Sequence, residues 1–268
     1  MSARVRTGTA LDPILADVER RAAERRRARS AADLRAEALP DPARRARFVG
    51  ALSGPGLALI AEHKRRSPSA GALASATDLG ARLAAYARGG ADALSILTEE
   101  DHFGGSLDDL RAAAACGLPR LRKDFVLDEG MVLESLAAGA DAVLLIARCL
   151  PDPLLGELRA LAGELGLAVL LEVHDERELE RALAARPDCL GVNARDLATM
   201  QVRLETVERL LPLAAGAALR VAESGIRTAA DAARVHAAGA DAALVGEVLM
   251  RAGDPAALLT AWKESCGG

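Results

Sequence analysis

The chain has 268 residues, of which 51% are hydrophobic, and its formal net charge is −4 at pH 7. This length fits a single barrel-sized domain, and the apolar content is ample for its core. The negative charge disfavours a polyanionic partner such as nucleic acid, and no run approaches the roughly 18 apolar residues that a membrane helix needs.

A helical extension is predicted ahead of the first strand. Apolar periodicity favours a helix over residues 11–38, with Pro13 suited to its first turn. Pro40 and Pro42 then end it. We expect residues 1–50 to form an extension that lies over the barrel mouth, within one domain that spans residues 1–268.

The extension contains a basic run, RRAAERRRAR, at residues 20–29. Such a run can bind nucleic acid or form a solvated helix face. Glutamates are interleaved with the arginines, and aromatic residues make up only 2% of the chain, so platforms for stacking bases are missing. We therefore interpret the run as a solvated face and expect no nucleic-acid partner.

An internal repeat predicts the fold of the remaining chain. Ala-rich helical stretches end at a glycine and lead into an aliphatic run at Gly90 (GADAL), Gly139 (GADAV) and Gly239 (GADAA), a spacing of one or two units of about 50 residues. One such unit holds two βα pairs, so four units make an eightfold barrel.

Eight short aliphatic runs agree with this repeat, at residues 57–61, 93–97, 119–122, 142–146, 168–171, 189–192, 219–222 and 242–245. Because the runs are continuously apolar, they indicate strands buried on both faces, as in a parallel sheet. We predict an α/β fold, a (β/α)8 TIM barrel with an N-terminal helical extension. An open doubly wound sheet is the alternative, but its usual GxGxxG turn does not follow the first run.

Polar residues follow seven of these runs, at the strand ends where barrels of this kind carry their chemistry. They include Glu62, Lys64, Ser67, Glu99, Lys123, Asp124, Glu172, Asn193, Arg195, Glu223, Ser224 and Glu247. Any one of them could be a solvated strand end. Lysines and carboxylates that converge on one mouth instead predict an acid–base site.

Two features refine this site. Apolar walls lower the pKa of a lysine, which suits a general acid, and Lys123 lies directly after a buried run. Lys64 lies in a visibly basic segment, so a surface position remains open for it. Glycine turns in ESGI (223–226) and VGE (245–247) follow the last two strands, where barrels commonly bind phosphate through backbone N–H groups.

Neither metal nor cofactor is expected. The four cysteines and four histidines are widely spaced, without a CxxC pair, and no dinucleotide fingerprint is present. The cysteine pattern is typical of reduced thiols, so we expect a cytoplasmic protein. Its expected partner is a small phosphorylated substrate, with no membrane contact and a monomeric or weakly homo-oligomeric state.

Eight segments resemble the indole-3-glycerol-phosphate synthase family, in family order. They are IAEHKRRSPSAG (60–71), LTEEDHFGGSL (97–107), RKDFVLDE (122–129), AGADAVLLIA (138–147), LLEVHDERELERAL (170–183), GVNARDL (191–197), AESGI (222–226) and LVGEVLM (244–250). The resemblance implies ring closure of 1-(2-carboxyphenylamino)-1-deoxyribulose 5-phosphate to indole-3-glycerol phosphate, with loss of carbon dioxide and water, in tryptophan biosynthesis.

The same resemblance implies roles for individual residues. Lys123 would be the general acid, Glu172 the general base of the dehydration, and Lys64 the group that holds the substrate carboxylate or assists the departing hydroxyl. Glu62 and Asn193 would orient these groups, with Arg195 and Glu223 near the substrate. The phosphate would be held by Ser67, Ser224, Gly225, Gly246 and Glu247. The anthranilate ring would be lined by Phe103, Phe125, Leu144 and Leu197.

Three positions depart from the family pattern: His63 replaces a common tyrosine, Arg122 a common cysteine, and Ala194 a second asparagine or serine. Rival interpretations are another phosphate-binding barrel isomerase or lyase, a paralogue that serves a secondary-metabolite pathway, and a non-catalytic scaffold. An aldolase would need a Schiff-base lysine after the sixth strand, where Asn193 stands instead.

Overall fold

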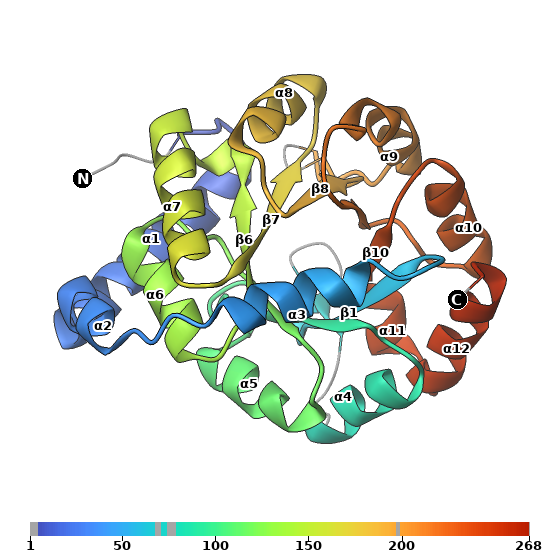
Figure 1. Cartoon of the computed structure of the whole chain (residues 1–268), viewed down its shortest axis with the longest axis horizontal. Helices are drawn as coiled ribbons and strands as arrows, with labels where there is room; N and C mark the ends of the chain where they lie inside the picture. Colours follow the sequence, from blue (N-terminus) through green and yellow to red (C-terminus); the bar gives the residue numbers. More distant parts are fainter. Residues whose placement is uncertain (1–4, 68–70, 74–78, 197–198, 268) are drawn as a thin grey trace.

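The computed structural model describes residues 5–67, 71–73, 79–196 and 199–267. Eight parallel strands close into a barrel in the order β1-β10-β9-β8-β7-β6-β5-β4, and β4 pairs back with β1 (Figure 1). Their bounds are β1 Ala58–His63, β4 Ala93–Leu97, β5 Arg120–Lys123, β6 Ala142–Ile146, β7 Ala168–Val173, β8 Cys189–Asn193, β9 Arg220–Glu223 and β10 Ala242–Val245. The predicted (β/α)8 barrel is confirmed, and each predicted run is a strand.

Several strands extend further at their carboxyl ends than the apolar runs indicated. Glu172 stays in register with Gly191, and Asn193 stays in register with Glu223. Glu62 and Lys123 likewise lie on β1 and β5. These polar residues therefore project from the rigid sheet rather than from the loops that follow it.

Helices surround the barrel and mostly begin at a side-chain cap, as at Asp128, Asp175 and Thr228. Their bounds are α4 Leu79–Arg88, α5 Leu107–Ala112, α6 Glu129–Ala137, α7 Asp152–Glu164, α8 Glu176–Ala185, α9 Leu204–Leu210, α10 Ala229–Ala237, α11 Glu247–Arg251 and α12 Pro255–Ser265. Short 3-10 helices lie at η1 Ala113–Cys116, η2 Ala147–Cys149 and η3 Pro212–Ala214. A small antiparallel pair that was not predicted, β2 Arg66–Ser67 with β3 Gly71–Ala72, follows β1.

The sequence repeat corresponds to a hydrogen bond at the amino ends of the strands. In each quarter of the barrel an aspartate before one strand accepts the N–H of a residue near the start of the preceding strand. The pairs are Asp92 with Leu59, Asp141 with Arg120, Asp188 with Val169, and Asp241 with Arg220. The fourth copy is hidden in the sequence because Arg186, with φ 49°, takes the left-handed position that glycine holds in the other three.

The N-terminal segment differs from the predicted single helix over residues 11–38. It forms α1 (Leu11–Ala28) and α2 (Ala31–Glu37), because Ser30 and Asp33 build a capping box that starts a new helix. Pro42, which was expected to end the helix together with Pro40, instead opens α3 (Pro42–Leu52).

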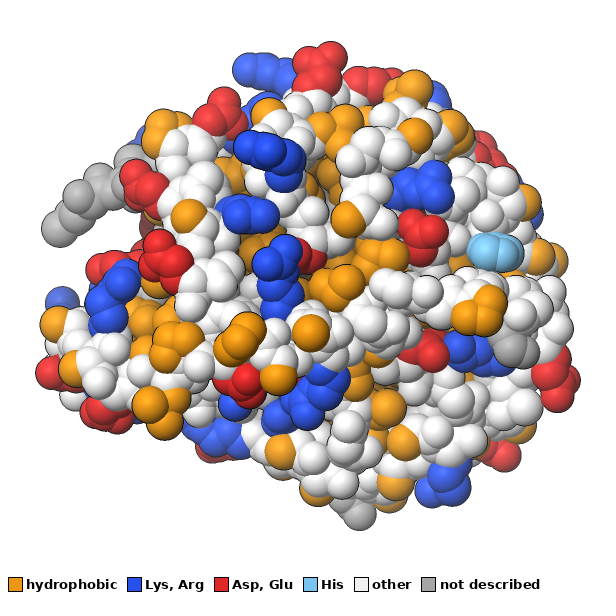
Figure 2. Space-filling view, viewed as in Figure 1, with side chains coloured by type: hydrophobic (Ala, Val, Ile, Leu, Met, Phe, Trp, Pro, Cys, Tyr) orange, Lys and Arg blue, Asp and Glu red, His pale blue; other side chains and the backbone are white. Residues whose placement is uncertain are grey.

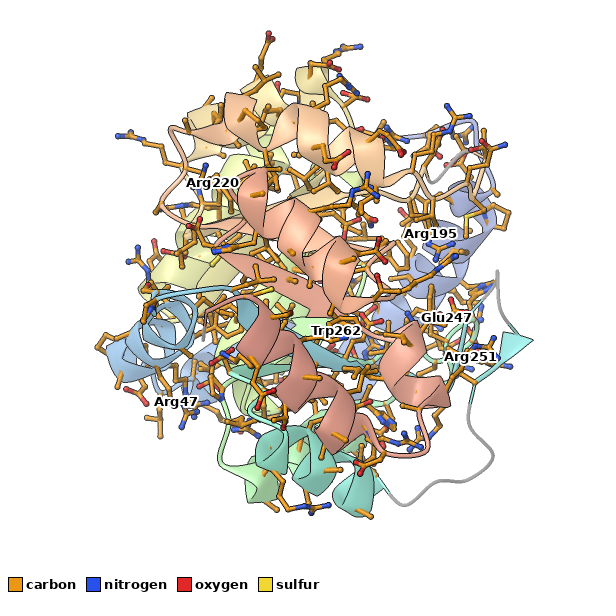
Figure 3. The ribbon with its side chains drawn as sticks, turned by 90° about the vertical axis from the view of Figure 1, so that its right-hand side faces the viewer. Arg47, Arg195, Arg220, Glu247, Arg251 and Trp262 are labelled. Atoms are coloured by element: carbon orange, nitrogen blue, oxygen red, sulfur yellow. The ribbon has the colours of Figure 1, made fainter. Side chains whose placement is uncertain are left out.

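These helices reach opposite ends of the barrel. Residues of α1 line the cavity at the carboxyl ends of the strands. In contrast, α3 crosses the amino ends, where Phe48 is fully buried and Arg47 pairs with Asp141 (Figure 1). Figure 3 shows Arg47 and Arg220 at one end of the molecule and Arg195, Glu247 and Arg251 at the other. Only part of residues 1–50 therefore lies at the mouth that the whole segment was expected to cover.

On the end that α3 crosses, basic and acidic side chains are interspersed (Figure 2). Arg45 pairs there with Asp188, and Lys263 pairs with Asp92. Both aspartates belong to the repeated strand-start contacts. The ion pairs at this end of the barrel therefore stabilise the fold, and the functional site is expected at the opposite end.

Candidate active site

A cavity of about 330 Å³ opens at the carboxyl ends of the strands. The predicted site residues that line it are Glu62, Lys64, Phe103, Lys123, Phe125, Leu144, Glu172, Asn193, Arg195, Glu223, Ser224, Gly225, Gly246 and Glu247. Leu197 lies outside the described residues, as does the side chain of Ser67. The fold thus brings together residues from all parts of the chain, including Ala10, Leu11 and Ile14 of the N-terminal segment, which the sequence analysis did not single out.

Lys123 is the charged centre of this cavity. Its Nζ atom lies 2.9 Å from Oε2 of Glu172 and 3.6 Å from Oε2 of Glu223. The amide of Asn193 donates to the other carboxylate oxygen of Glu172 at 3.0 Å. All four side chains lie on strands, so the barrel itself holds the ammonium group of Lys123 and the carboxylate of Glu172 at a fixed separation.

The two carboxyl groups beside Lys123 have opposite pKa shifts. Burial alone would raise the pKa of Glu172, but Lys123, His174 and Asn193 outweigh it and hold that pKa well below its ordinary range. Burial and the negative charge of Glu172 raise the pKa of Glu223 to about 8, against the opposing effect of Lys123. Near neutral pH Lys123 therefore lies beside one ionised and one protonated carboxyl group.

Lys123 itself differs from the expectation of a lowered pKa. Burial does act in that direction, but the negative charges of Glu172, Glu223 and Glu62 more than compensate and raise the pKa of Lys123 above its ordinary value. The sequence analysis considered the apolar walls without knowing which carboxylates would face the lysine. Lys123 is thus a fully charged ammonium group with a proton to give.

A second lysine–carboxylate pair lies across the cavity. Nζ of Lys64 is 2.6 Å from Oε1 of Glu62, and the carboxylate of Glu62 is buried. The surface position that remained open for Lys64 is excluded by this contact and by its place in the cavity wall. The site therefore has two separate lysine–carboxylate pairs.

One side of the cavity is apolar. The rings of Phe103 and Phe125 lie 6.3 Å apart between centroids and are tilted by 47°. Leu144 from β6 and Leu11 and Ile14 from α1 line the same cavity. Such a slot suits a flat aromatic group.

The opposite wall is formed by tight turns after β9 and β10. Ser224 and Gly225 are both in the left-handed region, with φ 63° and φ 80°. Gly246 precedes the short helix α11, and Arg227 and Arg251 line the cavity nearby. Backbone N–H groups in such turns, with cationic side chains beside them, suit an anion.

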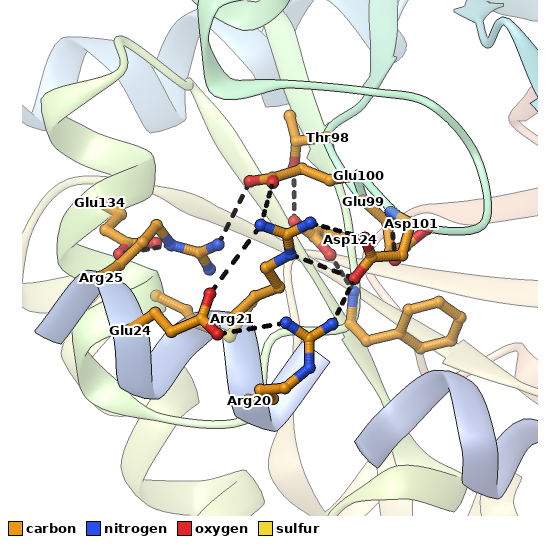
Figure 4. A network of polar contacts seen from close by, with 12 residues as sticks. Arg20, Arg21, Glu24, Arg25, Thr98, Glu99, Glu100, Asp101, Asp124 and Glu134 are labelled. Atoms are coloured by element: carbon orange, nitrogen blue, oxygen red, sulfur yellow. Dashed lines mark hydrogen bonds and ion pairs between the residues drawn. The ribbon is translucent and has the colours of Figure 1, made fainter. Parts of the chain in front are cut away.

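Helix α1 is fastened over the mouth by the arginines of the basic run (Figure 4). Arg21 forms hydrogen bonds with both carboxylate oxygens of Asp101, at 2.8 and 3.2 Å. Arg20 lies 3.0 Å from the same carboxylate, and Arg25 bonds Glu134 at 2.9 Å. The run was interpreted as a solvated face, but much of its charge is paired with acids in the loop after β4 and on α6.

Comparison with known proteins decides the family. A family model described as indole-3-glycerol phosphate synthase matches residues 11–261. A relative of that name from Nocardioides sp. is 50% identical over 247 residues, which are 91% of this chain and 94% of the relative. Indole-3-glycerol phosphate synthase 2 of Streptomyces coelicolor is 48% identical, over 90% of this chain and 94% of its own length.

The chain belongs to the indole-3-glycerol phosphate synthase family. It is therefore a decarboxylating lyase of tryptophan biosynthesis. Among solved structures, thiamine phosphate pyrophosphorylase from Pyrococcus furiosus superposes with a TM-score of 0.58 at 19% identity, over 78% of this chain and 95% of that one. That likeness shows the barrel fold alone.

The residues that line the cavity include none of the three departures from the family pattern, His63, Arg122 and Ala194. The guanidinium of Arg122 is buried on the outer side of β5, where it bonds the carbonyl oxygen of Met131 at 2.8 Å and Asp124 at 3.0 Å. His63 is also buried, and burial lowers its pKa to about 4. Both side chains support the barrel from behind, so they leave the family's site intact.

His174 is a site residue that the sequence analysis missed. Its ring is buried directly behind Glu172, with Nε2 at 3.2 Å from Oε1 of that carboxylate. The signal in the sequence was only proximity, because His174 follows Glu172 by two residues and lies just beyond the end of β7.

Within the described residues no helix is long and apolar enough to cross a membrane. The same part of the chain contains no cluster of three or more His, Cys, Asp or Glu side chains arranged to hold a metal ion.

Proposed function

We propose that the cavity closes the indole ring of indole-3-glycerol phosphate from 1-(2-carboxyphenylamino)-1-deoxyribulose 5-phosphate, with release of carbon dioxide and water. The observation that carries this proposal is the position of Lys123, which lies between an ionised and a protonated carboxyl group. A flat apolar slot and an anion-suited wall within the same cavity fit the two ends of such a substrate.

In the first step, the ring carbon that bears the carboxylate attacks the ketone carbon. Lys123 donates its proton to the ketone oxygen, where negative charge develops. The ring then loses carbon dioxide, and the electrons of that bond restore its aromaticity. Positioning and one cationic donor are sufficient for this step.

In the second step, the new hydroxyl group leaves as water. Glu172 removes the proton from the neighbouring carbon, and Lys64 assists the departing hydroxyl or holds the substrate carboxylate before it is lost. Glu62 orients Lys64 through their 2.6 Å contact. Asn193 orients Glu172, while Arg195 and Glu223 face the substrate between these groups.

The remaining assignments place the two ends of the substrate. Phe103, Phe125, Leu144 and Leu197 hold the anthranilate ring, and Ser67, Ser224, Gly225, Gly246 and Glu247 hold the phosphate. The paired left-handed residues Ser224 and Gly225 support the second assignment. We also propose that residues 1–268 act as one catalytic domain, with α1 as part of its mouth.

The direct test is to add the substrate to the purified protein and follow indole fluorescence together with carbon dioxide release. We expect both signals in equal amounts, and we expect them to persist after exhaustive EDTA treatment. Lys123→Met serves as the inactive control. An absence of product with a folded wild-type protein would refute the proposal, and activity restored only by added metal would refute its metal-free form.

Two expectations of cellular context remain part of the proposal, namely a cytoplasmic location and a monomeric or weakly homo-oligomeric state. Cell fractionation and sedimentation of the purified protein at several concentrations test them.

A further inference from the structure

His174 bridges two carboxylates behind the cavity. Its Nε2 atom lies 3.2 Å from Oε1 of Glu172, and its Nδ1 atom lies 3.0 Å from Oε2 of Glu178. The side chain is only 2% exposed. His174 does not line the cavity, so it reaches the substrate only through Glu172.

Glu178 is fixed in place by the first turn of α8. Its carboxylate accepts the backbone N–H of His174 at 2.9 Å and Nε of Arg148 at 2.5 Å. Its own N–H donates to the capping side chain of Asp175 at 2.9 Å. Burial alone would raise the pKa of Glu178, but His174 and Arg148 lower it, so it stays an anion against the imidazole.

This geometry determines where one proton resides. Since Nδ1–H of His174 donates to Glu178, an unprotonated Nε2 would turn its lone pair toward an oxygen of Glu172. A proton on either of these two groups removes that repulsion. Glu172 already accepts from Lys123 and Asn193, which favours its ionised form and leaves the proton on His174.

We propose that His174, braced by Glu178, is a positioning residue that keeps Glu172 ionised and oriented throughout the reaction. The inference rests on the proposed role of Glu172 as general base. When Lys123 gives its proton to the ketone oxygen, Glu172 loses its nearest cation. The imidazolium of His174 remains, so the carboxylate is still an anion when the dehydration requires a base.

The titration of His174 depends on the charges around it. Burial would lower its pKa, but Glu172 and Glu178 raise it to about 9. The charged groups that face this cluster are Lys123 from β5, Arg148 after β6, Glu172 from β7, Asp175 and Glu178 at the start of α8, Glu223 from β9, and Asp196 after β8.

The first test is an NMR titration of the histidine rings. The chain has only four histidines, so the signals of His174 are identified by their loss in His174→Gln. We expect wild-type His174 to titrate at about pH 9, and Glu178→Gln to lower its pKa toward the ordinary value of about 6.5. His236, which faces the carbonyl oxygen of Ala240, is the internal control and should not shift. An unchanged pKa of His174 in Glu178→Gln would overturn the proposal.

The second test separates positioning from a general effect on folding. His174→Gln should lower kcat by about 10- to 100-fold, as for other partners that orient an active-site group, with KM changed by less than about threefold. Loss of the cation raises the pKa of Glu172, so the acidic limb of the pH profile of kcat/KM should move to higher pH. A merely structural role would lower activity equally at every pH, and that result would overturn the proposal.

The proposed function and the inference about His174 can fail independently. If the wild-type protein forms no product, the proposed function fails, and the NMR titration alone decides whether Glu178 keeps the proton on His174. If His174→Gln does not fold, Glu178→Gln replaces it in the kinetic test, and the same shift of the acidic limb is expected. An unshifted limb in a folded Glu178→Gln would then count against the proposal.

Discussion

Gly246 provides the space that the carboxyl group of Glu62 occupies, because a Cβ atom at position 246 would overlap with Oε1 of Glu62. Glu62 in turn holds Lys64 at 2.6 Å. A glycine that the sequence assigned to phosphate binding therefore also sets the position of a lysine–carboxylate pair.

This relationship predicts the effect of Gly246→Ala. The added methyl group should displace Glu62 and with it Lys64, and a misplacement of about 1 Å can lower kcat on the order of 10²-fold. Steady-state kinetics measure the effect. Gly253→Ala is the matched control, because nothing lies within 4 Å of a Cβ atom there. A rise in KM with kcat intact would mean that Gly246 acts on the phosphate alone.

Lys123→Met should abolish the general acid and lower kcat by about 10² to 10⁴-fold in single-turnover experiments. It also leaves Glu172 and Glu223 without the cation between them, so the free energy of unfolding should fall by about 3–5 kcal/mol. Adding Glu172→Gln removes the ionised carboxylate that Lys123→Met leaves unpaired, and it should restore much of the stability without restoring activity. Recovery of activity in the double variant would contradict the acid assignment.

Glu223 predicts a pH dependence of stability. Its pKa is about 8 in the folded protein and near its ordinary value in the unfolded chain, so the folded state holds an extra proton between these two values. The contribution of Glu223 to stability therefore falls as the pH rises through this window and is flat outside it. Glu223→Gln cannot titrate there. In urea unfolding, the free energy of unfolding of Glu223→Gln should rise relative to that of the wild type between about pH 5 and pH 8. An equal pH dependence in the two proteins would rule out the raised pKa of Glu223.

The arginine contacts of α1 predict that the KM for the substrate depends on salt concentration. Arg21→Gln breaks the paired hydrogen bonds to Asp101, and exposed contacts of this kind contribute little to the free energy of unfolding. We expect a several-fold higher KM with little change in kcat, and a weaker response of KM to added salt than in the wild type. Arg111→Gln, which breaks a surface pair with Asp108, should leave KM unchanged. An equal salt dependence of KM in both variants would mean that α1 does not contribute to substrate binding.

The phosphate assignment predicts an anion in crystals grown with phosphate or sulfate. It should lie within hydrogen-bond reach of the backbone amides of Gly225, Gly246 and Glu247, because both turns face the cavity. Soaking with the substrate should displace it. An anion found only at the arginines of residues 20–29 would refute the assignment.

Much of this protein was determined by its sequence alone. The GAD repeat and the eight aliphatic runs predicted the barrel, since strands buried on both faces must be continuously apolar. Polar residues at the strand ends predicted the site for the same reason: a parallel barrel gathers all carboxyl ends at one mouth. Lys123 and Glu172 were identifiable in this way before any contact was known.

Only the tertiary structure decided which groups face each other, and therefore their charge states. Lys123 was expected to have a lowered pKa, but carboxylates from β7, β9 and β1 reverse that shift. The pairing of Arg21 with Asp101 likewise depends on a partner far away in the chain. Periodicity specifies the face of a strand on which a side chain lies, whereas Coulomb interactions depend on distances between strands that are not adjacent in sequence. Closure of the barrel sets those distances.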